Sequence, residues 1–348
     1  MTSGYAAHEP GQPLIPFTFE RRTIGASDIR LEIDYAGICH SDIHQARGEW
    51  GRARFPMVPG HEIVGRVVEC GSGVKRFQIG DAVGVGVYID SCRQCDPCRA
   101  GESHFCDNGM IETYNGVERD GVTLTYGGYS TDYVIDENYA IALPKDFLRP
   151  EVAPLLCAGI TLYSPLRHWQ AGPEKSVAVI GLGGLGHVGV KIASALGADV
   201  TVISHSPTKE ADAYRLGATS FLHMDGQSGI RRKFDLILNT VSADLDLEPY
   251  LQMLRINGTL VCIGLPSKPY AVRAGALLDG RRSIAGSMIG SVGECEEMIQ
   301  FAHRNSILSE IEVIDPTQIN EAFERTVKSD VRYRFVIDIK KWRETLQQ

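Results

Sequence analysis

Apolar runs and amphipathic stretches alternate in the middle of the chain. Residues 177–180 and 200–203 are short apolar runs, and residues 185–196 between them have the spacing of a helix that ends before Gly197. Further apolar runs that predict strands lie at residues 236–238, 260–263 and 283–285. Strands that alternate with helices in this way form a doubly wound parallel sheet, so the predicted fold class is α/β.

The segments on either side of this region have a different pattern. Up to about Leu156 the chain is rich in glycine and in short β-branched runs, such as residues 63–68 and 82–87, which predicts a β-rich, barrel-like domain. From about Cys295 the pattern predicts helices at residues 296–303 and 319–328 and a closing strand at 333–337, which could return to the first domain. We therefore predict two domains, residues 1–157 with 295–348 and residues 158–294.

Length and charge narrow the class of protein. The chain has 348 residues, and about 150 residues per domain again gives two domains. It has 35 Lys and Arg against 43 Asp and Glu, and a net charge of -8 argues against nucleic acid as a partner. In residues 1–16 no Lys or Arg precedes an apolar run, so no secretory signal and a cytoplasmic location are expected. The most apolar stretch, residues 177–203, includes charged residues and six glycines, so no membrane span is expected.

A glycine-rich loop lies directly between a predicted strand and a predicted helix. Residues 181–186 have the sequence Gly-Leu-Gly-Gly-Leu-Gly, which matches the G-x-G-x-x-G pattern of dinucleotide-binding loops. Gly181 permits the tight turn, Gly183 lets the backbone approach a pyrophosphate, and Gly186 lets the helix pack closely on the strand. Gly184 and Leu185 complete the loop, whose amides would face the phosphates at the helix start. The alternative is an ordinary turn, but the surrounding strand and helix favour a dinucleotide site.

The end of the second strand bears on which dinucleotide is bound. An acid at this position would bond the ribose 2′-hydroxyl of NAD and repel a 2′-phosphate. The chain instead has Ser204, His205, Ser206 and Lys209, which can all donate to a phosphate. We therefore predict NADP(H) rather than NAD, the alternative being a polar turn.

Four cysteines lie close together in the first domain. Cys92, Cys95, Cys98 and Cys106 form C-x2-C-x2-C-x7-C, and four thiolates with this spacing can close a tetrahedral zinc site. An iron–sulfur loop usually ends in a shorter spacing followed by proline, whereas Asp107 follows Cys106. Four free thiols are the remaining alternative. A zinc with four protein ligands has no open position, so its role is predicted to be structural.

A second set of metal ligands is dispersed along the chain. Cys39, the pair His61 and Glu62, and Cys157 lie in separate glycine-containing segments. Two thiolates, one imidazole and a water would make an open, catalytic zinc. Cys157 alone would be read as a core residue and His61 alone as a loop histidine, but their presence beside a zinc loop and a dinucleotide fold favours the metal site.

Six motifs in sequence order carry a resemblance to a known family. They are Gly37-Ile38-Cys39-His40-Ser41-Asp42, Pro59-Gly60-His61-Glu62, the four-cysteine loop, Gly127-Gly128-Tyr129-Ser130, Cys157-Ala158-Gly159-Ile160-Thr161 and the glycine loop. Over nearly its whole length the chain resembles the zinc-dependent medium-chain alcohol dehydrogenases, in their NADP-dependent cinnamyl alcohol dehydrogenase and aldehyde reductase branch. The resemblance implies a GroES-like catalytic domain, a Rossmann domain, and a homodimer formed through residues 283–287.

The resemblance also implies roles for single residues. Cys39, His61 and Cys157 match the ligands of the catalytic zinc, and Glu62 matches a residue behind the metal or transiently on it. The proton relay is expected to include Ser41, His44 and, less directly, Glu49, which stands where relatives often carry an aspartate. His40 is expected near the cofactor phosphates, the alternative being a surface loop histidine, and Thr161 is expected near the cofactor. Independently of the resemblance, we expect Ile289 near the nicotinamide and Trp50 and Met110 as apolar walls of the substrate pocket, although Trp50 could equally be ordinary packing. Ser41 could also cap a short helix.

The leading hypothesis is therefore a zinc-dependent reductase of aldehydes to primary alcohols that uses NADP(H), contains two zinc ions per chain and also runs in reverse. Aromatic or medium aliphatic aldehydes are the expected substrates. A polyol or secondary-alcohol dehydrogenase on the same scaffold is one alternative, and a non-enzymatic zinc module that binds a partner is another. Cys70, Cys262 and Cys295 lie outside every motif and are expected to be small buried residues.

Overall fold

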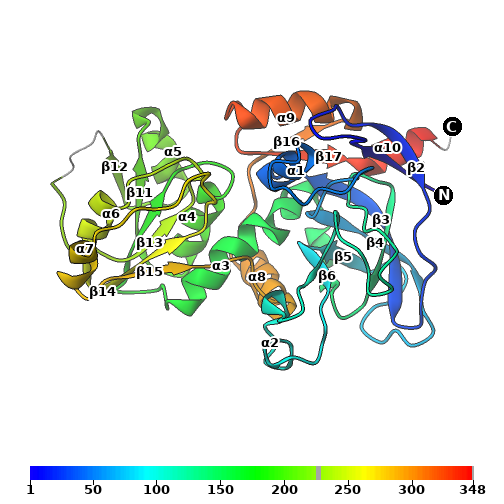
Figure 1. Cartoon of the computed structure of the whole chain (residues 1–348), viewed down its shortest axis with the longest axis horizontal. Coiled ribbons are helices and arrows are strands. Elements are labelled where there is room, and N and C mark those ends of the chain that lie inside the picture. The colour runs from blue at the N-terminus through cyan, green and yellow to red at the C-terminus, as the bar shows by residue number, and fades with distance from the viewer. Residues whose placement is uncertain (225–228, 347–348) are drawn as a thin grey trace. The chain divides into compact units, whose positions relative to one another are not determined.

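The computed structural model of the chain describes residues 1–224 and 229–346 (Figure 1). The chain divides into two compact units. One unit comprises Met1–Cys157 and Gly290–Gln348, and the other comprises Ala158–Ile289.

The unit formed by Ala158–Ile289 contains a parallel sheet of six strands within its described residues. Their order across the sheet is β12 (Ser220–His223), β11 (Asp199–Ser204), β10 (Ser176–Ile180), β13 (Phe234–Asn239), β14 (Leu254–Cys262) and β15 (Ser283–Gly286). In chain order this is 3-2-1-4-5-6, with every adjacent pair parallel, which is the strand order of the Rossmann fold. The predicted doubly wound α/β fold is confirmed.

The helices of this unit connect its strands. They are α3 (Ala158–His168), α4 (Gly186–Ala195), α5 (Glu210–Arg215), α6 (Glu248–Met253) and α7 (Ala274–Leu278). The fully buried β10 and the apolar face of α6 share one core, in which Phe234, Leu251 and Leu260 have no exposed surface. β14 begins six residues before the run at 260–263 predicts, because a register shift lets Leu254 pair with Phe234 ahead of the regular ladder.

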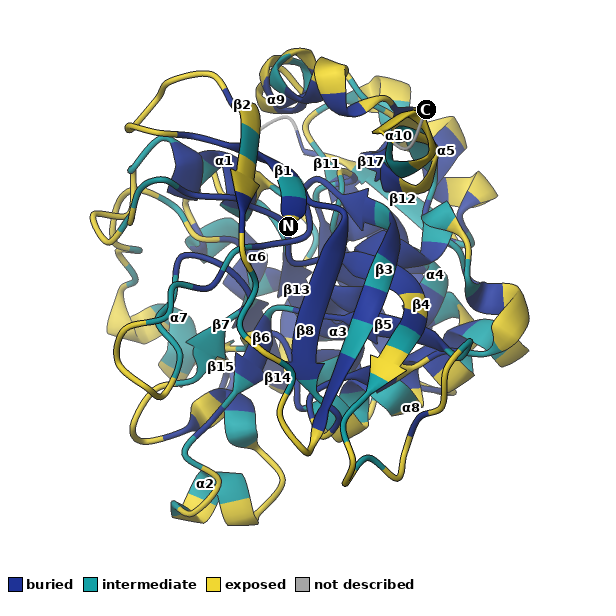
Figure 2. Cartoon of the chain, turned by 90° about the vertical axis from the view of Figure 1, so that its right-hand side faces the viewer, coloured by how far each residue is buried: buried dark blue, intermediate teal, exposed yellow. Residues whose placement is uncertain are grey.

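The other unit is built on a mostly antiparallel sheet. Its strands are, in order, β16 (Ile311–Ile314), β17 (Arg334–Asp338), β3 (Asp28–Gly37), β4 (Ile63–Cys70), β5 (Ala82–Val85) and β9 (Ile141–Ala142), and β8 (Asp132–Asp136) also pairs with β3. Figure 2 shows β8, β3 and β5 largely buried, with exposed positions on β4. The closing strand predicted near the C-terminus is β17, which pairs antiparallel with β3 and so belongs to this sheet.

Two small two-stranded sheets and several helices complete this unit. One sheet pairs β1 (Thr2–Ala6) with β2 (Ile15–Phe19), and the other pairs β6 (Tyr88–Asp90) with β7 (Ile111–Glu112). The helices are α1 (His40–Ala46), α2 (Asp96–Arg99), α8 (Val292–Arg304), α9 (Ile319–Val327) and α10 (Ile339–Leu346). α8 begins before the predicted residue 296 because Ser291 and Glu294 form a capping box, in which each side chain accepts from the backbone N–H of the other.

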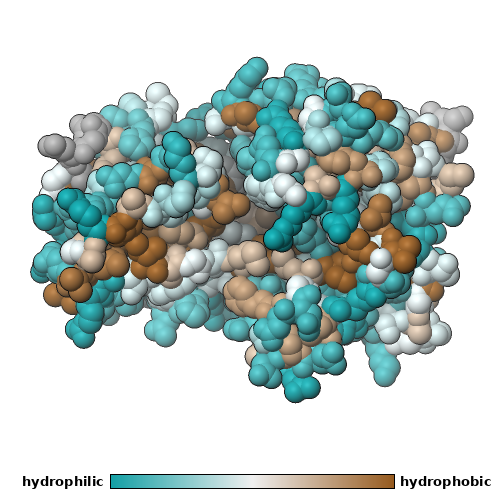
Figure 3. Space-filling view, in the orientation of Figure 1, coloured by the Kyte–Doolittle hydropathy of each residue, from teal (hydrophilic) through white to brown (hydrophobic). Residues whose placement is uncertain are grey.

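Among the described residues, no helix is both long and apolar enough to cross a bilayer. The face drawn in Figure 3 is mostly hydrophilic, with hydrophobic residues in separate small groups.

Candidate active site and zinc sites

The dispersed ligands come together in the β-rich unit. Cys39 directly precedes α1, His61 and Glu62 directly precede β4, and Cys157 follows a short 3-10 helix at Pro150–Leu156. One ligand atom from each of these four residues lies within 4.8 Å of the others. His61 Nε2 is 3.3 Å from Cys157 Sγ, and only Cys39 is more than marginally exposed. The fold thus brings a histidine ring nitrogen, two thiols and a carboxylate to one point.

The charge states in this cluster are strongly perturbed. Hydrogen bonds from the Cys157 thiol and the His61 ring lower the pKa of Cys39 well below its usual value, although burial opposes them. Burial raises the pKa of Glu62 to about 7, although the Arg334 guanidinium opposes the shift. Glu62 Oε2 is buried and has no hydrogen-bond partner among the described residues. A thiolate, a ring nitrogen and an unpartnered carboxylate oxygen are the donors that a zinc ion accepts, so the residues present fit zinc.

Asp42 holds the histidine of this cluster, and the sequence interpretation missed it. Its fully buried carboxylate accepts from His61 Nδ1 and the Gly60 N–H through Oδ1, both at 3.1 Å. Oδ2 accepts from the Cys39 N–H at 2.8 Å and from the Tyr129 hydroxyl at 3.0 Å. A carboxylate on Nδ1 fixes the tautomer that leaves Nε2 free for a metal. Asp42 stands in the Gly37–Asp42 motif, so its position was a usable signal.

Arg334 is a second residue that the sequence did not reveal. It lies on β17, where its side chain is buried, and it donates to the Ile38 carbonyl at 2.8 Å and to Glu62 Oε1. This bond orients the Glu62 carboxylate from a strand 272 residues away in the sequence. Because no local pattern marks an arginine for such a distant contact, the sequence had no signal for it.

The four-cysteine loop forms a separate cluster. The Sγ atoms of Cys92, Cys95, Cys98 and Cys106 all lie within 4.8 Å of one another, and the thiols are free. The Sγ–Sγ distance is 3.9 Å between Cys92 and Cys98 and 4.0 Å between Cys95 and Cys106. Backbone and side-chain donors at Gln94 and Asn108 lower the pKa of Cys92 to about 5, which favours a thiolate. Four soft donors in this arrangement fit a zinc with no open position.

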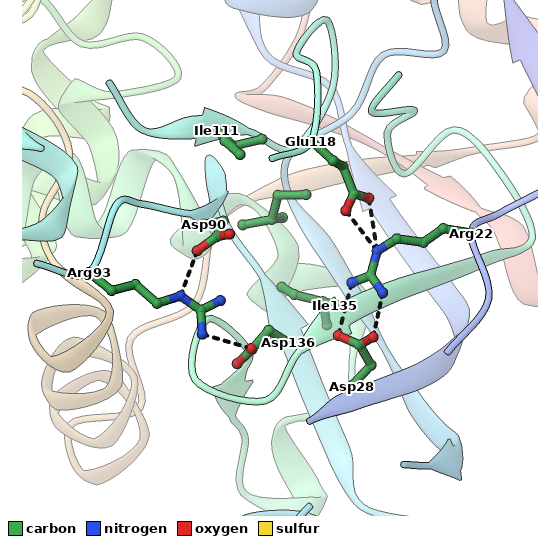
Figure 4. Close-up of a pocket in the computed structure, with 9 residues that line it drawn as sticks. Arg22, Asp28, Asp90, Arg93, Ile111, Glu118, Ile135 and Asp136 are labelled. Atoms are coloured by element: carbon green, nitrogen blue, oxygen red, sulfur yellow. Dashed lines mark hydrogen bonds and ion pairs between the residues drawn. The ribbon is translucent and has the colours of Figure 1, made fainter. Parts of the chain in front are cut away.

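Arg93 connects this loop to the sheet of the same unit. Its guanidinium donates to Asp90 at 2.8 Å and to Asp136, at the end of β8, at 3.0 Å. Figure 4 shows these contacts on one side of a cavity of about 80 Å³, with Arg22 held by Asp28 and Glu118 on the other side. The cavity contains no residue of either cysteine cluster, and its labelled charges pair with one another. We therefore regard it as structural and not as the active site.

The three residues of the expected relay all lie on or just after α1. Ser41 Oγ is 3.7 Å from Cys39 Sγ, and His44 Nδ1 is hydrogen-bonded to Glu49 Oε2. The Trp50 ring stacks on His44 with centroids 5.2 Å apart. The interpretation of Ser41 as a helix cap is wrong: Cys39 is the N-cap residue, and the Asp42 carboxylate accepts from its N–H.

The glycine loop has the shape that a dinucleotide needs. Gly181 has φ +89°, which L side chains rarely adopt. A Cβ on Gly186 would lie 2.1 Å from the Gly181 carbonyl oxygen, so only glycine lets α4 start this close to β10. A Cβ on Gly183 would meet no atom within 4 Å, so this part of the loop is open to a ligand. Gly184 and Leu185, between Gly183 and Gly186, are partly exposed.

The residues expected at the 2′-phosphate lie at the end of β11 and just beyond it. Ser204, Ser206 and Lys209 are partly exposed and His205 is exposed. The Ser204 hydroxyl accepts from the Ser206 N–H at 3.1 Å, and His205 Nε2 is 3.3 Å from the Tyr250 hydroxyl. From residue 204 to residue 209 the chain has no acid, and its polar side chains there are hydroxyls, an imidazole and an ammonium group.

Several other expected residues lie outside these clusters. Thr161 is buried on α3, Ile289 is buried with φ +40°, Met110 is partly exposed, and His40 is an exposed residue at the start of α1. Of the three cysteines without a motif, Cys295 is buried as expected, whereas Cys70 and Cys262 are only partly buried.

Comparison with known proteins agrees with this geometry. Residues 25–145 match the alcohol dehydrogenase GroES-like domain, and residues 184–304 match the zinc-binding dehydrogenase domain. The chain therefore belongs to the zinc-dependent medium-chain alcohol dehydrogenases, in the branch of cinnamyl alcohol dehydrogenases and aldehyde reductases, and it is an oxidoreductase of alcohols and aldehydes.

Particular relatives resemble it over nearly their whole length. An NADP-dependent alcohol dehydrogenase of Mycolicibacterium smegmatis is 54% identical over 340 residues, which cover 97% of each chain. An aldehyde reductase of Escherichia coli is 46% identical over 95% of this chain and 96% of its own. The structure of a cinnamyl alcohol dehydrogenase of Sorghum bicolor matches with a TM-score of 0.94 and 41% identity, and covers 98% of each chain.

Proposed function

We propose that this enzyme reduces aldehydes to primary alcohols with NADPH as the hydride donor, and that it catalyses the reverse reaction. The observation that carries this proposal is the convergence of Cys39, His61 and Cys157 beside the Ser41 hydroxyl. Three protein ligands are the usual complement of a catalytic zinc, and a closed set of four is the usual complement of a structural one.

Each of the two metal sites has its own residues. Cys39, His61 and Cys157 hold the catalytic zinc, with Glu62 as a neighbouring carboxylate whose pKa burial raises. Cys92, Cys95, Cys98 and Cys106 hold the structural zinc. When bound, the catalytic zinc supplies a Lewis acid for the carbonyl oxygen and NADPH supplies the hydride.

The chain's own residues handle the proton. Ser41 Oγ is the hydroxyl that can donate to the substrate oxygen in reduction, or accept from the alcohol in oxidation, because it lies 3.7 Å from Cys39 Sγ. His44 is three residues further along α1, 32% of its side chain is exposed, and its Nδ1 is hydrogen-bonded to Glu49. A hydroxyl and an imidazole in sequence can move a proton outward without opening the site to bulk water.

The cofactor preference rests on the end of β11. Ser204, His205, Ser206 and Lys209 offer donors and no repelling carboxylate, which suits a 2′-phosphate. The Mycolicibacterium relative is named as NADP-dependent, in agreement with this proposal. The open space at Gly183 suits the pyrophosphate of the same cofactor.

Replacing Ser204 by Asp tests this preference. The new carboxylate would face the 2′-phosphate, and juxtaposed like charges cost several kcal/mol. We expect the ratio of kcat/KM for NADPH to that for NADH to fall by about 100-fold. Ser204→Asn is the matched control, because asparagine has the size of aspartate and adds no charge. A Ser204→Asp enzyme that keeps the wild-type ratio would show that the 2′-phosphate binds elsewhere.

A substrate panel tests the reaction itself. Aromatic and medium aliphatic aldehydes are the proposed substrates, as the names of the cinnamyl alcohol dehydrogenase and aldehyde reductase relatives suggest. Following NADPH absorbance, we expect higher kcat/KM for benzaldehyde, cinnamaldehyde and straight-chain aldehydes than for ketones, and little oxidation of polyols. Faster turnover of polyols or secondary alcohols would favour the alternative dehydrogenase.

The assembly and location are also proposed. β15 is the last strand of its sheet, and Ile284 is 36% exposed, so its free edge could pair with the same strand of a second copy. We infer a homodimer of this kind, which sedimentation would test. A cytoplasmic location agrees with the nine cysteines, none of which forms a disulfide among the described residues.

A further inference from the structure

The segment Gly127-Gly128-Tyr129-Ser130 has so far been described only through the hydrogen bond from Tyr129 to Asp42, yet its backbone lies along the loop that carries His61. The N–H groups of residues 127, 128 and 129 donate to the carbonyls of Val58, Gly60 and Pro59, at 2.7, 2.9 and 3.0 Å. The two segments are thus joined by three backbone hydrogen bonds immediately before His61.

This contact places the Tyr129 ring against the same loop. Gly60 has φ +108°, and a Cβ there would lie 2.7 Å from Tyr129 Cδ1. A Cβ on Gly127 would lie 2.3 Å from the Pro59 carbonyl oxygen. Tyr129 itself has no exposed surface, and the Phe323 ring on α9 lies 6.3 Å from it. The missing side chains at Gly60 and Gly127 therefore let the ring enter this position.

In this position the Tyr129 hydroxyl reaches Asp42, the residue that holds the His61 ring. The hydroxyl donates to Asp42 Oδ2 at 3.0 Å, and the Cys39 N–H donates to the same oxygen at 2.8 Å. The other oxygen accepts from His61 Nδ1. A carboxylate can turn about the bond that carries it unless both oxygens are held, so donors on Oδ2 also fix the direction of Oδ1.

We propose that Tyr129 is a positioning residue for the catalytic metal: its hydroxyl holds the Asp42 carboxylate, and Asp42 in turn orients the His61 ring with Nε2 toward Cys157 Sγ. This inference rests on the proposed role of His61 as a zinc ligand. It gives this segment a function, since Gly127 lets its backbone approach the Pro59 carbonyl, Gly60 leaves room for the ring, and Tyr129 supplies the donor. Groups that orient metal-bound histidines commonly affect metal affinity by 10- to 100-fold.

Tyr129→Phe is the decisive variant because it removes the hydroxyl and keeps the ring that fills the space beside Gly60. Tyr133→Phe is the matched control. Tyr133 is also buried in this unit, and its hydroxyl donates to the Thr113 carbonyl, outside both clusters. The measurement is the rate of zinc release from the purified holoenzyme to a coloured chelator. The phase that disappears in Cys39→Ala identifies the catalytic zinc, and the four-cysteine zinc is the internal reference.

We expect Tyr129→Phe to release the catalytic zinc about 10-fold faster, with the four-cysteine zinc unchanged, and Tyr133→Phe to match the wild type in both phases. In cobalt-substituted enzyme the visible absorption of the catalytic metal should shift in Tyr129→Phe alone. If Tyr129→Phe and Tyr133→Phe gave the same release rates and spectra while the wild type held two zinc ions, the role of Tyr129 would be wrong and the proposed function would stand. A wild type with a single zinc, held by the four cysteines, would overturn both proposals.

Discussion

The two cysteine-containing clusters of the β-rich unit both fit a zinc ion but are assembled in opposite ways. The four-cysteine loop takes all its donors from residues 92–106, and local N–H groups support them, as where the Cys92 N–H donates to Cys106 Sγ at 3.3 Å. The other cluster takes donors from residues 39, 61, 62 and 157 and is supported by side chains from distant segments. A closed site can thus be specified by one short segment, whereas an open site depends on the whole fold to position few ligands.

Of the variants that distinguish the two clusters, Cys39→Ala is expected to have the largest effect on activity. A Lewis acid contributes several kcal/mol to the transition state, so we expect kcat to fall by at least about 1,000-fold. Zinc content should fall from two ions per chain to one, with Tm close to that of the wild type. Cys70→Ala removes a partly exposed thiol outside both clusters and is the control. Appreciable activity in Cys39→Ala would show that the reaction does not need this thiolate.

Cys95→Ala should have the opposite outcome. Losing a structural zinc removes binding free energy that is also folding free energy, and a loss on the order of 3–5 kcal/mol would lower Tm by roughly 10 °C. Turnover per folded molecule at low temperature should remain close to that of the wild type. Thermal unfolding and a parallel activity assay measure the two effects. If Cys95→Ala lost activity and kept its stability, the roles of the two clusters would have to be exchanged.

Ser41→Ala tests the chemistry at the open cluster without touching a ligand. Removing a group that transfers a proton in the transition state should lower kcat by about 100-fold. The KM for NADPH should hardly change, because the hydroxyl lies at the thiol cluster and not at the glycine loop. Steady-state kinetics with both substrates varied separates these parameters. An unchanged kcat would remove Ser41 from the relay.

Glu49→Gln should have the smallest effect. Glu49 and His44 form a partly exposed pair, with 44% and 32% of their side chains exposed, and such pairs are worth up to about 1 kcal/mol, which is at most roughly fivefold in kcat. Glu324→Gln is the control, since Glu324 is also exposed and pairs with Arg47, just after α1. A similar kcat for both variants would place Glu49 outside the relay.

The fold was largely predictable because its apolar runs are local signals. β10, α4 and β11 all lie within one or two residues of their predicted bounds. The two-stranded sheet of β1 and β2 was missed, since β2 is mostly exposed and has no apolar run like those of the buried strands. The early start of β14 was missed as well, because it depends on pairing with Phe234 and not on its own sequence.

The candidate site was predictable in its ligands but not in their support. Spacing indicated the four-cysteine cluster, whereas the dispersed cluster was indicated by the joint presence of its residues beside a zinc loop and a dinucleotide fold. Asp42, Tyr129 and Arg334 act through contacts with residues far away in the chain, and an aspartate, tyrosine or arginine is common enough that its type alone indicates nothing. Tertiary structure supplies this information.

The most direct test of the account is a diffraction measurement at the zinc absorption edge on crystals of the enzyme with bound NADPH. We expect two anomalous peaks per chain, one among Cys39, His61 and Cys157 and one among the four cysteines of residues 92–106. A single peak, within the four-cysteine loop alone, would show that the dispersed cluster does not hold the catalytic metal.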